Sequence, residues 1–313
     1  MSKFVLEPGR RIYVAGHGGL VGSAVWRHMK ARGLDELVGW RSAELDLRDR
    51  DATFDAMLSS HPDVVVVAAA RVGGILANAS EPVDFLNDNL RIQTNLFEAA
   101  HAAEVDRLVF LGSSCIYPKL AQQPIQESSL LTGPLEPTNE AYALAKIAGI
   151  MAIRAYRHQY GRHWISAMPT NLYGPGDNFD LTRSHVLPAM IRKYHEASAT
   201  GQPVVLWGTG SPKREFLHVD DLARAVVFLL EHYDDEQTIN VGTGQDVTIR
   251  GLAAMVAEVT GFTGDTTWDT TKPDGTPRKL LDVSRLTELG WKPEIGLRDG
   301  IRSAYEWYLD NAE

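Results

Sequence analysis

Residues 14–22, VAGHGGLVG, follow a short apolar run and precede an amphipathic segment, and they decide the fold of this chain. Gly16, Gly19 and Gly22 stand three residues apart in this stretch. In a strand-turn-helix unit the first glycine permits a tight turn, the second lets the backbone approach a pyrophosphate, and the third lets helix and strand pack closely. The helix N-terminus then offers free N–H groups to the phosphates. The stretch therefore predicts a dinucleotide site near the start of the chain.

Short apolar runs alternate with longer helical patterns through the first half of the chain. Continuous apolar strands separated by helices indicate a parallel sheet covered on both faces. Right-handed crossovers then give an α/β fold with a doubly wound, Rossmann-type sheet. The predicted strands are residues 11–16, 35–40, 63–70, 107–112 and 164–170. The predicted helices are residues 21–33, 49–61, 83–105 and 139–160.

The second half is less regular and contains Gly and Pro clusters, such as YGPGDN at 173–178. This texture is typical of a smaller, loop-rich α/β domain at the carboxyl ends of the sheet strands, where ligands of open α/β sheets bind. We expect residues 1–171 to form the dinucleotide-binding domain, with 218–241 returning to it. The substrate domain is expected to comprise residues 172–217 and 242–313.

The composition argues against several classes of protein. With a net charge of -9 and no basic run among its 313 residues, the chain does not resemble a nucleic-acid or membrane-surface protein. Its one cysteine, Cys115, excludes an internal disulfide and suggests a reducing compartment. The N-terminal residues lack the apolar core of a signal peptide, and the apolar run 64–70 is too short to span a bilayer. We therefore expect a cytoplasmic protein, and no metal site is expected.

The residues after the second predicted strand bear on the choice of dinucleotide. NAD sites usually carry an acid there that binds the ribose hydroxyls, but this strand ends in Trp40-Arg41-Ser42. Arg41 could pair with the 2′-phosphate of NADP, or it could simply face solvent. Asp46 and Leu47 follow where an adenine ring would lie.

The stretch YALAK places Tyr142 and Lys146 four residues apart, on one face of a helix. An ammonium near the phenol favours the phenolate and would lower the pKa of Tyr142. Such a tyrosine can donate or accept a proton near neutral pH. The spacing also occurs by chance in ordinary surface pairs, but here a Ser-rich strand end precedes it.

Together these residues resemble the extended branch of the short-chain dehydrogenase/reductase superfamily, which acts on sugar nucleotides. The resemblance implies that Ser113 binds the substrate carbonyl beside Tyr142 and Lys146, and that Ser114 is a structural neighbour. It also implies a homodimer formed by residues 83–104 and 139–160, although the apolar residues of these helices could equally belong to the core.

Longer blocks resemble the enzymes that convert GDP-4-keto-6-deoxy-D-mannose to GDP-L-fucose by 3,5-epimerisation and NADPH-dependent 4-reduction. These blocks are GSSCIYPK, LEPTNEAYALAKIAGI, PTNLYGPGDNF, REFLHVDDLA, INVGTG and KPDGTPRKLLD. Alone, Cys115 would be core packing, but the resemblance implies that Cys115 is the base and His185 the acid of epimerisation. Tyr142 would protonate the C4 alkoxide, and Lys146 would hold the nicotinamide ribose.

The resemblance also implies two sets of binding residues. The cofactor set comprises Gly16, Gly19, Leu20, Val21, Gly22, Arg41, Asp46, Leu47, Lys146, Pro169, Asn171, Leu172 and His185. The substrate set comprises Asn171, Lys193, Trp207, Arg214, Asp274 and Lys279, with Arg214, Lys193 and Lys279 expected at the pyrophosphate of a GDP-sugar. Family members often carry Arg where this chain has Gly18 and Ser42, so Arg41 is the residue that could compensate.

Two other functions are compatible with the fold. One is reduction or epimerisation-reduction of another nucleotide-4-ketosugar, for example a GDP-4-keto-heptose, because sugar length cannot be read from these residues. The other is a dinucleotide-binding regulator without catalysis. Such regulators typically lose the tyrosine or the lysine, whereas this chain retains both Tyr142 and Lys146.

Overall fold

A computed structural model describes residues 4–272 and 274–311 of the chain. Its main sheet has six parallel strands in the order β2-β1-β3-β4-β5-β9. This order confirms the predicted doubly wound fold, because the chain starts near the centre, moves to one edge and then crosses to the other. The strands are β1 (Ile12–Ala15), β2 (Leu37–Val38), β3 (Val64–Val67), β4 (Arg107–Leu111), β5 (His163–Pro169) and β9 (Ile239–Val241).

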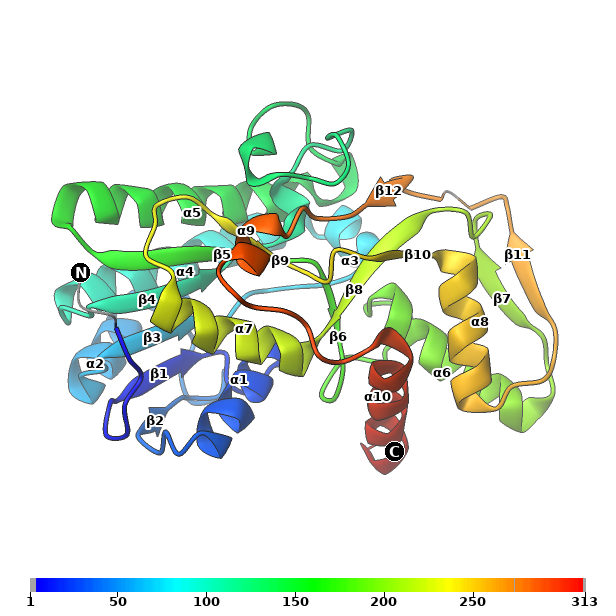
Figure 1. The fold of residues 1–313 in the computed structure, drawn as a ribbon, viewed down its shortest axis with the longest axis horizontal. Helices are drawn as coiled ribbons and strands as arrows, with labels where there is room; N and C mark the ends of the chain where they lie inside the picture. Colours follow the sequence, from blue (N-terminus) through cyan, green and yellow to red (C-terminus); the bar gives the residue numbers. More distant parts are fainter. Residues whose placement is uncertain (1–3, 273, 312–313) are drawn as a thin grey trace.

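Helices cover both faces of this sheet (Figure 1). One face packs on α1 (Leu20–Ala31) and α7 (Val219–His232), with Ile12, Val14 and Val25 in the shared core. The other face packs on α2 (Arg50–Ser60), α4 (Pro82–Ala102) and α5 (Glu140–Tyr160), with Tyr13 and Leu96 buried there. Neighbouring residues of β1 point to opposite faces, so a strand with helices on both sides is apolar throughout.

The second half builds a smaller lobe beside the main sheet (Figure 1). Strand β8 (Lys213–His218) pairs with β6 (Asn171–Tyr173), β10 (Asp246–Thr248) and β12 (Arg278–Lys279), and β7 (Val204–Trp207) pairs with β11 (Thr266–Asp269). The helices α6 (Val186–Thr200), α8 (Ile249–Thr260) and α10 (Leu297–Asn311) bury a third apolar core against these strands. Strand β9 lies in the main sheet beside β5. The predicted domain boundaries stay a prediction.

Short elements complete the chain. They are α3 (Ile75–Ser80), α9 (Ser284–Glu288) and the 3-10 turns η1 (Ser114–Ile116), η2 (Glu127–Ser129) and η3 (Pro137–Asn139). Two predicted strands are shorter than expected. The 35–40 strand is limited to Leu37–Val38, at the edge of the sheet. The 63–70 strand ends at Val67, and the next residues, Ala68 and Ala69, lie against Gly16 of the glycine-rich turn.

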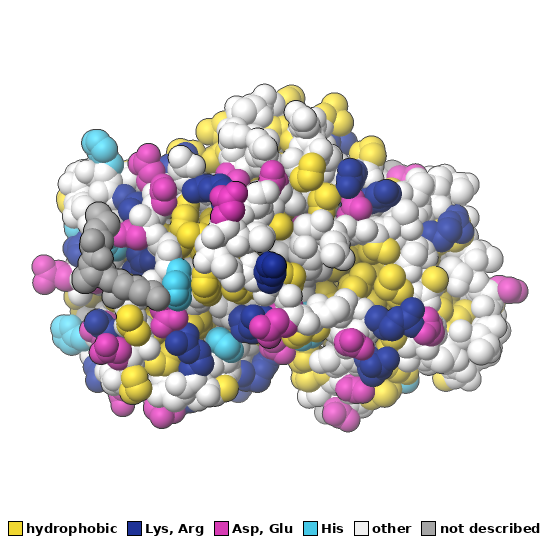
Figure 2. Space-filling model, in the orientation of Figure 1, with side chains coloured by type: hydrophobic (Ala, Val, Ile, Leu, Met, Phe, Trp, Pro, Cys, Tyr) yellow, Lys and Arg dark blue, Asp and Glu magenta, His cyan; other side chains and the backbone are white. Residues whose placement is uncertain are grey.

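The described residues include no helix long and apolar enough to cross a membrane. Figure 2 shows basic and acidic side chains intermingled over the face it presents, with apolar groups between them. This mixture differs from the single-sign surface that a nucleic-acid-binding face usually carries.

Candidate active site

The glycine-rich turn has the tight packing that its spacing predicts. Gly16 has φ of +85°, and a Cβ there would lie 2.7 Å from the backbone nitrogen of Ala69 on the neighbouring strand end. A Cβ on Gly22 would overlap the carbonyl oxygen of Gly16. Both positions therefore require glycine, one for its backbone conformation and both for lack of space.

The N-terminus of α1 is open. Gly19 is its N-cap and no side chain accepts from the first turn, so the N–H groups of Leu20 and Val21 have no intrahelical partner. The helix dipole adds partial positive charge at this point. The turn thus fits the pyrophosphate of a dinucleotide.

Arg41 lies beyond the edge strand, where the adenosine end would extend. Its backbone N–H donates to Glu44 at 2.7 Å, while its exposed guanidinium forms no ion pair with the described residues. Asp46 is engaged by Arg48, whose hydrogen bonds hold the pKa of that carboxyl below its ordinary value. Leu47 accepts from Asn95 through its carbonyl oxygen at 2.9 Å. Arg41 is therefore the cation with no competing partner, which fits a 2′-phosphate.

Ser113 stands at the carboxyl end of β4, where the sheet stops and η1 begins. Gly112 donates to Ala167 on β5, and a Cβ on Gly112 would overlap Met168, so the chain passes very close to the next strand. The Oγ of Ser113 accepts from the backbone N–H of Cys115 at 3.2 Å and fixes the turn. The buried Ser114 lies within η1. The turn thus holds Ser113 and Cys115 at the same strand end.

Tyr142 and Lys146 approach this strand end from α5, but their electrostatics differ from the expectation. The ammonium of Lys146 lies 5.9 Å from the centre of the Tyr142 ring and donates to the carbonyl oxygen of Leu111 at 2.8 Å. Burial lowers the pKa of Lys146 to about 7. The pKa of Tyr142 is raised, first by burial and then by Cys115, while Ser113 opposes the rise.

The expected lowering of the tyrosine pKa was therefore wrong. The lysine ammonium lies 5.9 Å from the ring centre, and the removal of Tyr142 from water is the largest influence on its pKa. Tyr142 consequently keeps its proton at neutral pH, which is the form needed to protonate an alkoxide.

Cys115 is partly buried, and two nitrogen donors face its sulfur. The side-chain amide of Asn139 donates at 3.3 Å and the ammonium of Lys279 donates at 3.5 Å. A hollow of about 50 Å³ adjoins the sulfur, with Lys119, Glu136 and other side chains in its wall. The sulfur therefore lies in a polar setting, unlike that of a cysteine used for core packing.

His185 is the N-cap of α6, and its loop is tied back by the hydrogen bond from Gly74 to Arg183 at 2.9 Å. The side chain of His185 is exposed, and nearby protein still removes part of its hydration. This loss of hydration lowers the pKa of His185, and the positive charge of Lys279 lowers it further. An imidazolium here gives up its proton more readily than a free histidine does.

Three predicted residues lie where β5 passes into β6. Pro169 ends β5 next to Val241 of β9. The amide of Asn171 donates to the backbone oxygen of Glu215 at 2.7 Å, and Leu172 packs against the core beneath α1 and α7. The side-chain amide of Asn171 is thus already used to hold β6 against β8 within the smaller lobe.

The predicted nucleotide-sugar residues lie in the smaller lobe. Trp207 ends β7 with about half of its surface exposed, and the ammonium of Lys272 lies 5.7 Å from its ring centre. Asp274 accepts from the backbone N–H of Thr209 at 2.7 Å and fixes the loop after β7. Lys193 donates to Val205 at 3.1 Å from the neighbouring helix. The exposed indole face can stack against a base or ribose.

Arg214 and Lys279 are direct neighbours across β8 and β12. Burial lowers the pKa of Arg214, and the carboxylate of Asp274 opposes this. Lys279 points to Cys115 rather than joining the other predicted pyrophosphate contacts, as its 3.5 Å contact with the sulfur indicates. The structure therefore connects the nucleotide end of the site to the proton-handling end.

Two residues of the site were not singled out from the sequence. Asn139 donates to Cys115, and its position just before the YALAK helix was the only signal. Glu215 is fully buried and accepts from the backbone N–H groups of Thr243, Gly244 and Leu281 at 2.6, 2.7 and 3.0 Å. Glu215 thus joins segments that lie far apart in the chain, so no local sequence pattern could reveal its contacts.

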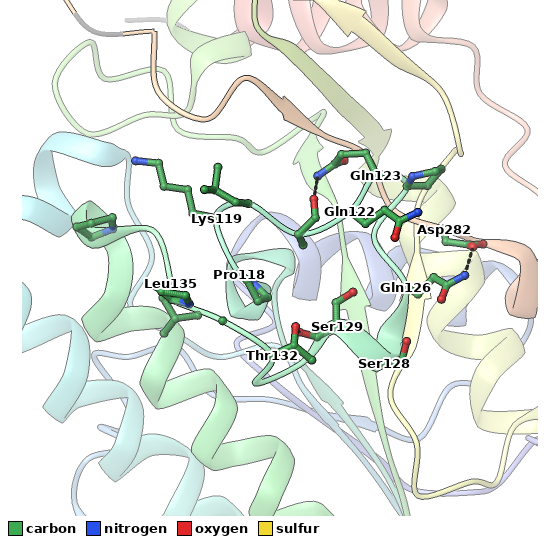
Figure 3. A pocket seen from close by; sticks show the side chains of 16 residues that line it. Pro118, Lys119, Gln122, Gln123, Gln126, Ser128, Ser129, Thr132, Leu135 and Asp282 are labelled. Atoms are coloured by element: carbon green, nitrogen blue, oxygen red, sulfur yellow. Dashed lines mark hydrogen bonds between the residues drawn. The ribbon is translucent and has the colours of Figure 1, made fainter.

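A larger hollow of about 790 Å³ lies within the 118–137 loop and shares Lys119 and Gln123 with the hollow beside the sulfur (Figure 3). Glutamine, serine and threonine side chains surround it, and Gln126 donates to Asp282 across one side. None of the predicted catalytic side chains lines this hollow. Its volume therefore does not locate the chemistry.

Comparison with known proteins agrees with the geometry. A model described as "NAD dependent epimerase/dehydratase family" matches residues 12–242. The chain belongs to this family. GDP-L-fucose synthase 1 of Arabidopsis thaliana is 58% identical over 307 residues, covering 97% of this chain and 95% of that protein. The predicted resemblance to extended short-chain dehydrogenases/reductases is thus confirmed.

Solved structures of the epimerase/dehydratase type share the whole fold. A GDP-6-OMe-4-keto-L-xylo-heptose reductase from C. jejuni has a TM-score of 0.94 and 34% identity, covering 98% of this chain and 99% of that one. A GDP-L-fucose synthetase from Naegleria fowleri bound to NADP has a TM-score of 0.92 and 29% identity, covering 99% of this chain and 98% of that one.

Proposed function

We propose that this chain converts GDP-4-keto-6-deoxy-D-mannose to GDP-L-fucose as a 3,5-epimerase and NADPH-dependent 4-reductase. The observation that carries the proposal is the meeting of Ser113 and Cys115, at the end of β4, with Tyr142 and Lys146 of α5. The name of the 58% identical Arabidopsis relative supports this activity. The NADP in the Naegleria structure supports the cofactor.

Epimerisation needs a base and an acid on opposite faces of the sugar. The 4-keto group acidifies the protons on C3 and C5. Cys115 as thiolate removes one such proton, and the electron pair moves to the C4 oxygen, where the hydroxyls of Ser113 and Tyr142 donate to the developing charge. His185 returns a proton to carbon on the other face, so the centre is inverted without any change of oxidation state.

Reduction follows at the same carbonyl group. NADPH supplies the hydride when it is bound, with the glycine turn of residues 16–22 and Arg41 as its binding groups. Tyr142 is protonated at neutral pH, and burial raises its pKa further; it gives its proton to the C4 oxygen. Lys146, held at Leu111, positions the ribose and the tyrosine.

Binding of the nucleotide end falls to the smaller lobe. Arg214 can fork two pyrophosphate oxygens, Lys193 adds a point charge, and the exposed ring of Trp207 can stack on the base or ribose. Asp274 and Asn171 are proposed sugar or ribose contacts, although each already holds a backbone group.

Similarity to solved structures of heptose enzymes supports a second substrate class. The C. jejuni heptose reductase matches this chain with 34% identity, so a GDP-4-keto-heptose is the alternative substrate. The 58% identity to the Arabidopsis enzyme favours the 6-deoxy sugar.

We further propose that the protein is cytoplasmic and forms a homodimer. The dimer would pair α4 and α5, because Val83 and Leu144 are exposed on these helices. Light scattering of the purified protein measures the mass of this assembly.

The test is turnover of GDP-4-keto-6-deoxy-D-mannose with NADPH in heavy water, analysed by mass spectrometry and NMR. We expect NADPH oxidation together with deuterium at C3 and C5 of an L-sugar. Oxidation of NADPH without deuterium entry would contradict the epimerase activity. If the chain does not turn over GDP-4-keto-6-deoxy-D-mannose but rapidly turns over a GDP-4-keto-heptose, the heptose is the substrate.

Two variants separate the chemical steps. Cys115→Ser should slow deuterium entry by about 10²-fold or more while NADPH binding is retained. Tyr142→Phe should slow hydride transfer by a similar factor and leave deuterium entry much faster than reduction. Equal losses of both activities in both variants would contradict the assigned roles.

A further inference from the structure

The donors around the Cys115 sulfur come from opposite sides of the site. Asn139 precedes α5, whereas Lys279 lies in β12 of the smaller lobe. A thiol is a weak hydrogen-bond acceptor, but a thiolate is strong and is stabilised by nearby cations. Two N–H donors at 3.3 and 3.5 Å are therefore an arrangement that favours negative charge on the sulfur.

The charge of Lys279 is not neutralised elsewhere in the described chain. Two other cations line the hollow beside the sulfur, and both have carboxylate partners. Lys119 lies 3.6 Å from Glu136, and Arg278 pairs with Asp246. Lys279 forms no ion pair with a carboxylate of residues 4–272 or 274–311, so its positive charge acts mainly on Cys115 and His185.

The segment that carries Lys279 is held in place on both sides. The backbone N–H of Leu280 donates to Gln123 at 2.9 Å, and that of Leu281 donates to the buried Glu215 at 3.0 Å. The backbone N–H of Ile125 donates to the carbonyl oxygen of Leu280 at 2.8 Å, and Lys279 of β12 lies opposite Arg214 of β8 in the strand register. A backbone fixed in this way keeps the base of the Lys279 side chain at a constant distance from Cys115, which limits the reorganisation needed to stabilise charge.

We propose that Lys279 is a positioning residue whose ammonium stabilises negative charge on the Cys115 sulfur during proton abstraction. This inference rests on the proposed function, because it assigns Cys115 the role of the base. It moves Lys279 from the pyrophosphate to the proton-transfer end of the site. Asn139 assists, since its amide can donate to the thiolate or, after rotation, accept from the thiol.

The ionisable groups around the sulfur are few. Lys279 contacts the sulfur, and Tyr142 is close enough that charge on the sulfur raises the pKa of the phenol. The charge of Lys279 also acts on His185, whose pKa it lowers. Lys119, Glu136 and Arg278 border the hollow but are paired. Lys279 is therefore the main cation acting on Cys115, and replacing it by a neutral residue removes that charge.

The chain offers a clean assay because Cys115 is its only cysteine. The rate of alkylation by iodoacetamide, followed by mass spectrometry from pH 5 to pH 10, reports the thiolate without any substrate. Lys279→Met should slow alkylation at pH 7 by about fivefold or more. Lys279→Arg should restore most of the rate.

The matched control is Lys119→Met, which removes a cation from the same hollow but leaves the contact between Lys279 and the Cys115 sulfur. An unchanged rate in Lys279→Met, or an equal loss of rate in Lys119→Met, would overturn the inference. NADPH binding and the thermal midpoint, measured for each variant, show that the fold is kept. If Lys279→Met does not fold, Lys279→Gln replaces it in the same comparison.

Alkylation is independent of turnover, so it separates the two proposals. Slower alkylation of Lys279→Met with no turnover of any GDP-ketosugar by the wild-type chain would reject the proposed function and leave the Lys279–Cys115 relationship standing. When turnover is present, Lys279→Met should lower the rate of deuterium entry at C3 and C5 and also change KM. The fold-change in the rate should be at least ten times the fold-change in KM.

Discussion

Lys146 donates a hydrogen bond of 2.8 Å to the carbonyl oxygen of Leu111, the last residue of β4. This contact fixes α5 to the strand end that carries Ser113. It also takes the ammonium out of water, and that burial lowers the pKa of Lys146 to about 7 from its ordinary value of 10.5. The lysine thus costs stability in the free protein because of its place in the site.

Lys146→Met should reveal this cost as a pH-dependent gain in stability. Between pH 7 and 10.5 the unfolded wild-type chain binds the lysine proton more tightly than the folded one, so its free energy of unfolding rises with pH in that window. Below pH 7 both states are protonated and the penalty is constant. The stability advantage of Lys146→Met should therefore shrink by roughly 2 to 3 kcal/mol between pH 6 and pH 9.

Urea unfolding at these two pH values measures the difference, since other titrating groups cancel between variant and wild type. The control is Lys30→Met, which removes an exposed lysine that is paired with Asp35. A difference between Lys146→Met and wild type that does not change with pH would contradict the lowered pKa. Activity should be lost in Lys146→Met even where stability is gained.

Gly22→Ala should damage the dinucleotide site through sterics alone. The added Cβ would overlap the carbonyl oxygen of Gly16, so the turn must move. We expect a loss of about 1 to 3 kcal/mol in stability and at least tenfold weaker NADPH binding. Gly18→Ala is the control, because a Cβ there meets nothing within 4 Å. Fluorescence titration with NADPH should separate the two variants.

Arg41→Ser should reduce the preference for NADPH over NADH about tenfold or more, because the guanidinium is the unpaired cation at the adenosine end. The affinity for NADH should hardly change. Arg50→Ser is the control, since Arg50 is also exposed but pairs with Glu98. An unaltered preference in Arg41→Ser would mean that Arg41 only faces solvent.

Glu215→Gln should loosen the segment that carries Lys279. The new amide can accept from Thr243 and Gly244 but presents N–H to the N–H of Leu281, which leaves that buried donor without a partner. We expect a loss of about 2 kcal/mol in the free energy of unfolding. Hydrogen exchange should speed up at residues 279–282. The exposed Glu288→Gln should leave both measurements unchanged.

The sequence alone determined the elements with strong local patterns. The apolar strands and the glycine spacing of residues 14–22 predicted the parallel sheet and the open N-terminus of α1. The spacing of Tyr142 and Lys146 predicted one helix face, and the apolar run 107–112 predicted the strand that ends before Ser113. These features depend on contacts between residues a few positions apart, so they can be read along the chain.

Tertiary structure decided the electrostatics of the site. Burial, rather than the Tyr142–Lys146 spacing, sets the directions in which both pKa values move. The contact of Lys279 with Cys115 joins residues 164 positions apart, and Glu215 joins the segments at residues 243–244 and 281. Such contacts depend on how the lobes pack, and the removal of groups from water depends on everything around them, which no local pattern contains.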